Sequence, residues 1–342
     1  MNWKAEKVVI FGGGGFLGRK LAKRLVMENC ASIRSFGRTA QPELERLGIE
    51  VLRGDIRDAA AVSSACRNAN LAFHTAAKAG VWGTWRDYHG INVLGTKNVL
   101  ASCRNAGITR LVYTSSPSIA YDPAQDSEGV DETAPWPSSY LAHYPRTKAM
   151  AEKLVCSENG AGLKTVSLRP HLIWGPGDPH LLPRIISRAR AKRLIRVGEG
   201  KNIVDMSYVD NVAEAHIKAA EALSCGTCAE GKAYFISDDH PVNLWQWLDE
   251  LLQHCELMSI RKSISYRNAC LLGKCCELAY SLLRLPGEPP MTRFVAGQLA
   301  HSHYFDISAA KRDLGYAPLV PQDLAFSKTV EWLRSTLLGD KA

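Results

Sequence analysis

The sequence contains no long hydrophobic run. No uninterrupted apolar stretch approaches the roughly 20 residues that a membrane-spanning helix needs, and the most hydrophobic late segment, residues 269–285, is broken by Lys274, Glu277 and Arg284. The polar start, Met1 to Lys7, leads into an apolar run, Val8 to Phe11, that is too short for a secretory signal. We therefore expect a cytoplasmic protein that touches a membrane, if at all, from its inner face.

Concentrated charge and a disulfide framework are also missing. The 342 residues include 42 Lys+Arg and 34 Asp+Glu, and the net charge of +8 is too diffuse for a nucleic-acid-binding surface. It fits an anionic cofactor or substrate. The ten cysteines of a chain this long, with no signal, favour a reducing compartment. Cys225 and Cys228 have the spacing of metal ligands but no second pair accompanies them, so we expect no metal site. Cys275 and Cys276 are expected to pack in the apolar segment.

The pattern that is present is an alternation of short apolar runs with amphipathic segments. This is typical of βαβ units, and it predicts an α/β fold: a Rossmann-type, doubly wound parallel sheet with a smaller, mostly helical C-terminal substrate lobe. The expected strands are Lys7–Phe11, Ser32–Phe36, Glu50–Arg53, Leu71–His74, Arg110–Ser115 and Thr165–Arg169, and the expected helices are Leu17–Met27, Ala59–Arg67, Gly95–Asn105 and Arg146–Glu158. We expect residues 1–178 to bind a dinucleotide, with 201–238 returning to that domain, and residues 179–200 and 239–342 to form the lobe.

A glycine-rich turn follows the first expected strand. Missing Cβ atoms let a backbone approach a pyrophosphate, and the helix N-terminus after the turn offers free N–H groups. Two spacings fit, Gly13/Gly15/Gly18 as GxGxxG or Gly12/Gly15/Gly18 as GxxGxxG, and both predict dinucleotide binding more than a structural turn. The predicted contacts at this turn are Gly12, Gly15, Phe16, Leu17 and Gly18.

The end of the second strand bears on which dinucleotide is bound. An acid there would bind the ribose hydroxyl of NAD(H), and residues 32–39 contain none. Arg38, helped by Thr39 and Arg34, could instead hold a 2′-phosphate, because a guanidinium matches phosphate geometry. NADP(H) is therefore favoured, with NAD(H) as the alternative if Arg38 is only a solvated loop residue.

The turn after the third strand is expected to meet the adenine. Asp55 and Ile56 stand there. The alternative for Asp55 is a helix cap for the segment that follows.

A tyrosine and a lysine four residues apart are the candidate catalytic pair. On a helix this spacing puts Tyr144 and Lys148 on one face. The reference pKa of a phenol, about 10, is too high for acid–base work at neutral pH, and a nearby ammonium lowers it. Ser115 and Ser116, at the end of an expected strand, could bind a reacting carbonyl oxygen.

Together these motifs resemble those of the extended short-chain dehydrogenases/reductases, in the 3β-hydroxysteroid dehydrogenase-like branch. The resemblance spans Lys7 to about Trp332 and rests on Gly12/Gly15/Gly18, His74–Ala77, Asn92–Val99, Tyr113–Ser116, Tyr144 with Lys148, and Leu168–Pro170. It implies that Ser116, Tyr144 and Lys148 are catalytic, that Ser116 is favoured over Ser115, and that Ala76, Ala77, Lys148 and Pro170 contact the cofactor. Pro145 departs from the pattern and suggests that Tyr144 lies at a helix start.

Within that branch the sequence is similar to two families. The 2-alkyl-3-oxoalkanoate reductases of bacterial olefin synthesis match at Ala76–Gly83, Leu172–Asp178, Gly231–Ser237 and Leu285–Pro290; the sterol-4α-carboxylate 3-dehydrogenases share Arg169–His171 and Gly200–Asp205. The first likeness implies NADPH-dependent reduction of a C3 ketone beside a carboxylate, on a large hydrophobic substrate. The alternatives are sterol oxidation at C3, sugar-nucleotide epimerisation, which the apolar lobe disfavours, and a non-enzymatic nucleotide-sensing module.

Other residues have weaker assignments. His171 and His180 are candidate carboxylate ligands or structural histidines, and Trp82, Trp85 and Trp174 either wall a substrate channel or pack in the core. A basic stretch, Leu181 to Ile195 with arginines at 184, 188 and 190, is either a solvated helix face or a contact for a membrane or a pathway enzyme. The resemblance also implies a homodimer.

Overall fold

The computed structural model describes residues 1–160, 162–226 and 228–339. Its centre is a seven-stranded sheet in which all neighbouring strands are parallel. The strand order is β12 (Ala233–Ile236), β7 (Lys164–Pro170), β5 (Arg110–Thr114), β4 (Leu71–His74), β1 (Lys7–Phe11), β2 (Ser32–Gly37) and β3 (Glu50–Arg53). The order reverses between β1 and β4, and sheets of this kind bind ligands outside the carboxyl ends of the strands at that point.

The predicted Rossmann-type sheet is confirmed. Val8 to Phe11 of β1 are all buried, as expected for a parallel strand with helices on both faces. The expected strand and helix ends differ from the observed ones by a few residues: β5 ends at Thr114, so Ser115 already lies beyond the strand. The C-terminal sequence supplies β12, which pairs with β7 at one edge of the sheet.

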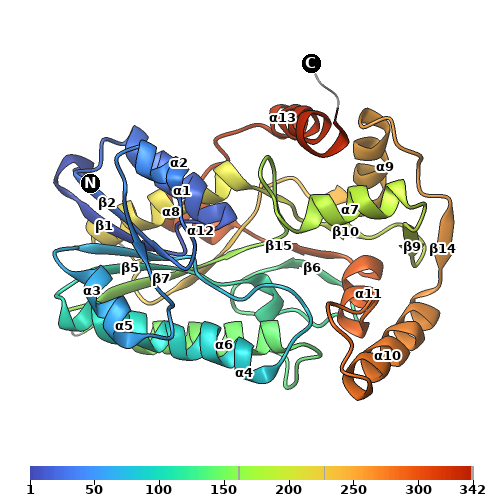
Figure 1. Ribbon diagram of the computed structural model, residues 1–342, viewed down its shortest axis with the longest axis horizontal. Coiled ribbons are helices and arrows are strands. Elements are labelled where there is room, and N and C mark those ends of the chain that lie inside the picture. The colour runs from blue at the N-terminus through green and yellow to red at the C-terminus, as the bar shows by residue number, and fades with distance from the viewer. Residues whose placement is uncertain (161, 227, 340–342) are drawn as a thin grey trace.

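Two layers of helices cover the sheet (Figure 1). One layer contains α1 (Phe16–Met27), α2 (Pro42–Arg46), α8 (Val209–Ser224) and α12 (Ser308–Leu314). The other contains α3 (Ala59–Cys66), α4 (Trp85–Tyr88), η2 (His89–Leu94), α5 (Gly95–Asn105) and α6 (His143–Ser157). Two clusters of buried apolar side chains, one on each side of the sheet, form the core of this half.

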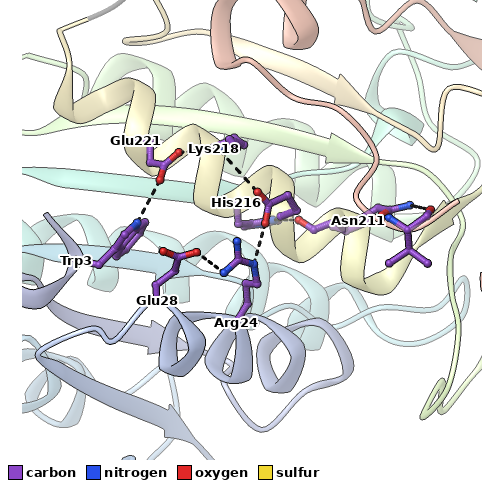
Figure 2. Close-up of polar contacts among 10 residues, drawn as sticks. Trp3, Arg24, Glu28, Asn211, His216, Lys218 and Glu221 are labelled. Atoms are coloured by element: carbon purple, nitrogen blue, oxygen red, sulfur yellow. Dashed lines mark hydrogen bonds and ion pairs between the residues drawn. The ribbon is translucent and has the colours of Figure 1, made fainter. Parts of the chain in front are cut away.

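Polar contacts tie α1 to α8 above the sheet (Figure 2). Arg24 of α1 binds Glu28 and donates from Nε to Glu214 of α8 over 2.8 Å. On the inner side of α8, Nδ1 of His216 donates to the Val212 carbonyl, so Nε2 accepts a 2.7 Å hydrogen bond from Oγ1 of Thr114. Helix α8 therefore fixes the end of β5, where the candidate serines follow.

The remaining elements form the smaller lobe, which is largely helical, as predicted. Its helices are α7 (Leu181–Arg190), α9 (Leu244–His254), α10 (Tyr266–Leu282), α11 (Arg293–Ala300), α13 (Gln322–Trp332) and η4 (Leu333–Leu338). Short strands link the lobe together: β6 (Ser127–Val130), β10 (Ile203–Val204), β13 (Val242–Asn243) and β15 (His303–Phe305) form one sheet, β8 (Ile173–Trp174) pairs with β11 (Ser207–Tyr208), and β9 (Ile195–Val197) pairs with β14 (Lys262–Ile264). A separate apolar cluster fills its interior.

The predicted basic helix is shorter than expected, because α7 ends at Arg190. Its arginines lie on an exposed or half-exposed face over a buried apolar stripe, as the solvated-face alternative expects, but each has a bonding partner. Arg184 binds Glu288, Arg188 donates to the Pro290 carbonyl, and Arg190 donates to the carbonyls of Leu337 and Leu338. These side chains hold later segments of the chain against α7.

The cysteines form no disulfide, and the described residues contain no cluster of His, Cys, Asp and Glu suited to a metal ion. Cys225 and Cys228 are exposed. The expectation that Cys275 packs inside is wrong: α10 turns it outward, and Cys276 is only partly buried. Within the described ranges, no helix has both the length and the apolar character needed to cross a membrane.

Candidate active site

Two adjoining pockets lie outside the carboxyl ends of the strands. The first follows β1, β2 and β3 and includes Gly12, Arg38 and Asp55 in its wall. The second follows β5 and β7 and includes Ser116, Tyr144, Lys148 and Pro170. Gly15, Thr75 and Ala77 belong to both walls, so the two pockets form one elongated cleft that crosses the switch point of the sheet.

The glycine turn is shaped by close backbone contacts. Gly12 has φ +90°, and a Cβ there would lie 2.6 Å from the amide N of Ala76. A Cβ on Gly18 would lie 2.1 Å from the carbonyl O of Gly12. Gly15 is exposed to the cleft and is the N-cap of α1, where no side chain occupies the free N–H groups. This geometry fits a pyrophosphate bound at a helix N-terminus.

The end of β2 carries a polar group that the sequence analysis did not single out. Gln41 is buried, accepts a 2.5 Å hydrogen bond from Oγ of Ser35, and has no partner for Nε2 among the described residues. It lines the first pocket, as exposed Arg38 and Thr39 do. An unpaired donor and a cation on this wall fit the adenosine half of a dinucleotide.

The expectation that Arg34 helps Arg38 is wrong. The Arg34 guanidinium binds Glu50 on β3 and donates to the carbonyls of Ala65 and Arg67, and it does not line the pocket. The parallel register pairs Arg34 with Glu50, which draws the side chain away from the cleft.

Asp55 and Ile56 line the first pocket, as predicted for residues near an adenine. The alternative that Asp55 caps the next helix is wrong, since Asp58 accepts the hydrogen bonds from the amides of Ala60 and Ala61 at the start of α3. The Asp55 carboxylate instead binds Arg57, and this hydrogen bond lowers the pKa of Asp55 to about 2.

Tyr144 and Lys148 lie one helical turn apart on α6 and face the second pocket. Pro145 is in the first turn, where the missing N–H has no partner to lose, so the helix start predicted from this proline is confirmed. Burial raises the pKa of Tyr144, while its hydrogen bond with the Ser116 side chain lowers it.

Lys148 is almost fully buried. Its Nζ donates a 2.5 Å hydrogen bond to the carbonyl of Thr114 and lies 4.3 Å from the centre of the Tyr113 ring. Burial lowers the pKa of Lys148 to about 7, against a smaller opposing effect of the Glu152 carboxylate. The charge of Glu152 is mostly used elsewhere, because it forms a buried ion pair with Arg169.

The two serines after β5 differ in their contacts. Oγ of Ser116 is 2.9 Å from Oγ of Ser118 and also accepts from the Ser118 amide, at the start of a short helical turn, η3 (Pro117–Ile119). Ser115 is in the same pocket, and its hydroxyl is buried without a partner in the described part of the chain. The Ser116 side chain lowers the pKa of Tyr144, which favours Ser116 as the serine next to the phenol.

Every predicted site residue except Gly18, which packs beneath the loop, lines one of the two pockets. Sequence reasoning missed Gln41 and Tyr121, neither of which belongs to a recognisable spacing, whereas Thr75 lies within the segment His74–Ala77 that carries the family resemblance. The suggestion that tryptophans wall a substrate channel is wrong for the second pocket: Trp174 packs in the core against Trp247, and Trp82 contacts Tyr280. The Phe and Tyr side chains in that wall are Phe16, Tyr121, Tyr144, Phe294 and Phe305.

A comparison with protein families shows which family the chain belongs to. Residues 9–265 match the 3-beta hydroxysteroid dehydrogenase/isomerase family, a segment that contains the whole cleft wall except the part from α11 and β15. The chain belongs to this family. It is therefore an NAD(P)-dependent oxidoreductase that acts on CH–OH or C=O groups.

Relatives agree with that assignment. A 2-alkyl-3-oxoalkanoate reductase of Stenotrophomonas maltophilia is 46% identical over 92% of this chain and 95% of its own length. A human sterol-4-alpha-carboxylate 3-dehydrogenase is 31% identical over 97% of this chain and 89% of its own. Among solved structures, a dTDP-glucose 4,6-dehydratase from Streptomyces venezuelae with NAD bound has a TM-score of 0.76 at 19% identity, covering 96% of this chain and 97% of that one. This last likeness concerns the fold alone.

Proposed function

We propose that the protein reduces a 2-alkyl-3-oxoalkanoate to the 2-alkyl-3-hydroxyalkanoate with NADPH. The observation that carries the proposal is the single cleft in which the glycine turn and Tyr144 face the same space. The 46% identity with a reductase of that name, over nearly the full length of both chains, supports the substrate class. Apolar side chains of the second pocket, such as Phe294 and Leu181, suit alkyl chains.

The chain's own groups have distinct tasks in this reaction. The chemistry that a bound nicotinamide would supply is hydride transfer to the carbonyl carbon at C3. Tyr144 donates a proton to the carbonyl oxygen, and Ser116 donates a hydrogen bond to the same oxygen and orients it. Lys148 holds the nicotinamide ribose, and its ammonium lowers the pKa of the phenol when protonated. The Thr114 carbonyl fixes the position of Nζ.

NADPH rather than NADH is proposed from the wall of the first pocket. Arg38 and Thr39 line it beyond β2, and the carboxylate of Asp55, the acid in that wall, is bound to Arg57. A guanidinium without a carboxylate partner attracts a 2′-phosphate more than a 2′-hydroxyl. Gly12, Gly15, Phe16, Leu17, Ile56, Ala76, Ala77 and Pro170 would complete the cofactor site.

A sterol 3β-hydroxy-4α-carboxylate is the second candidate substrate, favoured by the 31% identical human relative. Both substrates carry an oxygen at C3 beside a carbon with a carboxylate. They differ in shape, because one has flexible chains and the other a rigid ring system. Residues 179–200 and 239–342, apart from α12 on the central sheet, would form the substrate-binding part in either case.

We propose further that α10 docks on an anionic lipid surface. Leu271, Leu278 and Leu282 recur at helical spacing and are 62, 58 and 71% exposed. Exposed Arg267 and Lys274 on the same helix have no ion pair among the described residues. The carboxylate of α10, Glu277, is bound to Arg293. An apolar stripe with unpaired cations is complementary to anionic headgroups over acyl chains.

The position of α10 suggests how docking on a lipid surface would serve the second pocket. The helix lies at the outer end of the lobe (Figure 1) and packs on α11, whose Phe294 lines the second pocket. Tyr280 of α10 also contacts Trp82, next to Val81 in the pocket wall. A substrate with long alkyl chains could then enter from the lipid without crossing water. A homodimer remains a separate prediction from family resemblance.

A substrate panel tests the proposed reaction. Purified protein is incubated with NADPH or NADH and a 2-alkyl-3-oxo acid, and with NADP⁺ or NAD⁺ and either a 2-alkyl-3-hydroxy acid or a 3β-hydroxysterol 4α-carboxylate. Absorbance of the reduced nicotinamide is followed. We expect turnover of the alkyl acids with the phosphorylated cofactor; turnover of the sterol alone would replace the proposal by its alternative.

A further inference from the structure

A chain of two imidazoles lies in the wall of the second pocket, on the side of β7. His171 directly follows Pro170, and its Nε2 lies 2.6 Å from Nδ1 of His303 on β15. Nε2 of His303 lies 2.9 Å from the carbonyl O of Gln298. Both rings are buried, and His171 lines the pocket.

The hydrogen bonds of His171 and His303 determine which ring nitrogens of the two imidazoles carry a hydrogen. A carbonyl only accepts, so Nε2 of His303 carries a hydrogen. In the neutral ring Nδ1 of His303 is then an acceptor, and Nε2 of His171 donates to it. Burial beside His303 keeps the pKa of His171 well below its usual value, so the pair without a ligand is neutral. Nδ1 of His171 is left as an acceptor that has no hydrogen bond among the described residues.

A second unpaired group lies next to this chain. The Tyr121 ring packs on His303 with centroids 5.1 Å apart, and the residue lines the same pocket. Tyr121 is almost fully buried, and its hydroxyl has no partner in the described part of the chain. A buried hydroxyl without a partner costs free energy that a bound ligand can recover.

Among the described residues, the groups around the His171 imidazole include no carboxylate that would compete with the carboxyl group of a substrate. The titratable groups around His171 are His303 and Tyr121 from the lobe side and Asp178 and His180 from the loop before α7, while Tyr144 and Lys148 line the pocket from α6. Asp178 does not compete, because its carboxylate accepts hydrogen bonds from the amides of His180, Leu181 and Leu182.

We propose that Nδ1 of His171 and the hydroxyl of Tyr121 bind the carboxyl group of the substrate, with one proton shared between the carboxyl and the imidazole. This inference rests on the proposed function and identifies the residues that make the site prefer a C3-oxygenated acid to a neutral analogue. His303 is a positioning residue that holds the His171 ring through its own bond to Gln298. The hydroxyl of Tyr121 donates the second hydrogen bond to the carboxyl.

The test compares an acid with its neutral form. A 2-alkyl-3-hydroxyalkanoate and its methyl ester, with identical alkyl chains, are oxidised with NADP⁺, and the ratio of kcat/KM for acid over ester is measured. His171→Phe should lower the ratio about tenfold or more by raising KM for the acid, since a charge-assisted hydrogen bond is lost. Tyr121→Phe, which removes a single oxygen, should lower it in the same direction. His303→Asn should raise KM for the acid by a larger factor than KM for the ester.

Controls separate this inference from the proposed function. Ester turnover and cofactor binding report that each variant is folded, and exposed His240→Ala should leave the ratio unchanged. An unchanged ratio in both His171→Phe and Tyr121→Phe would overturn the carboxyl site. Equal kcat/KM for acid and ester in the native protein would also overturn the carboxyl site, but it would not contradict the proposed reductase function. Failure of the native protein to oxidise either compound would instead remove the proposed function.

Discussion

Nζ of Lys148 donates a hydrogen bond of 2.5 Å to the carbonyl of Thr114, from one turn behind Tyr144 on α6. Thr114 is the last residue of β5, and its side chain is bound to His216 of α8. The position of Lys148 therefore depends on α6, which carries it, and on α8, which holds Thr114, and these two helices cover opposite faces of the sheet. Its orientation toward the cleft depends on the packed fold, and this relationship leads to predictions about cofactor binding, stability and catalysis.

Gly12→Ala should abolish tight cofactor binding. The new Cβ would meet the backbone of Ala76 at 2.6 Å, and φ +90° disfavours any residue with a side chain. Fluorescence of NADPH on titration with protein measures the effect. Gly107→Ala is the matched control, because Gly107 also has a positive φ but no neighbour within 4 Å. It should lose stability only, and retention of tight binding in Gly12→Ala would contradict the proposed phosphate site.

Arg38→Ala should weaken NADPH binding about tenfold or more while changing NADH binding little, since a charge-assisted contact with the 2′-phosphate is lost. Arg34→Ala is the control, because Arg34 binds Glu50 and backbone carbonyls away from the pocket. Dissociation constants for both cofactors would be compared. Equal weakening of NADPH and NADH in Arg38→Ala would show that Arg38 does not select the phosphate.

Lys148→Met should flatten the dependence of stability on pH. The folded pKa of about 7 lies below the ordinary lysine value of about 10.4. Between these values the unfolded chain binds a proton that the folded chain does not, so this residue makes the free energy of unfolding rise as the pH rises from 7 to about 10. Below pH 7 its contribution is constant. Urea unfolding at pH 7, 8 and 9 measures the slope, with the exposed Lys97→Met as control. An identical slope in Lys148→Met and native protein would refute the buried neutral lysine.

Leu278→Asp combined with Leu282→Asp should abolish binding to vesicles of phosphatidylglycerol and phosphatidylcholine at low salt. Co-sedimentation measures this, and added salt should release the native protein. Leu319→Asp with Leu324→Asp is the control, since these leucines are also exposed but lie outside α10. Native protein that stays in the supernatant would end the lipid proposal. The native protein could instead fail to bind vesicles but self-associate, and lose this self-association in the α10 variant. That result would assign the exposed face of α10 to contact with a second copy of the chain.

Local patterns were sufficient to predict the parts of the site that depend on short spacings. The glycine turn, the Tyr144–Lys148 pair and the strand-end serines each lie within a few consecutive residues of one element or its end, so local rules place them at the cleft once the parallel sheet forms. Asp55 and Ile56 follow from the same rule, because they stand just past the end of a parallel strand.

The groups that were missed depend on contacts between distant elements. His303 meets His171 across 132 residues, and no spacing in the sequence relates them. Arg34 was misjudged because its partner Glu50 is chosen by strand register. Cys275 was expected inside because its segment is apolar, yet α10 buries only a narrow side against α11 and exposes the rest.

Tyr144→Phe tests the central claim most directly. The substitution removes one oxygen, and the loss of a general acid costs about 10²–10⁴-fold in rate. We expect Tyr144→Phe to bind NADPH as the native protein does and to lose turnover by that factor. Tyr234→Phe, whose hydroxyl binds Asp313 away from the cleft, should be fully active. Undiminished turnover in Tyr144→Phe would show that the phenol is not the proton donor.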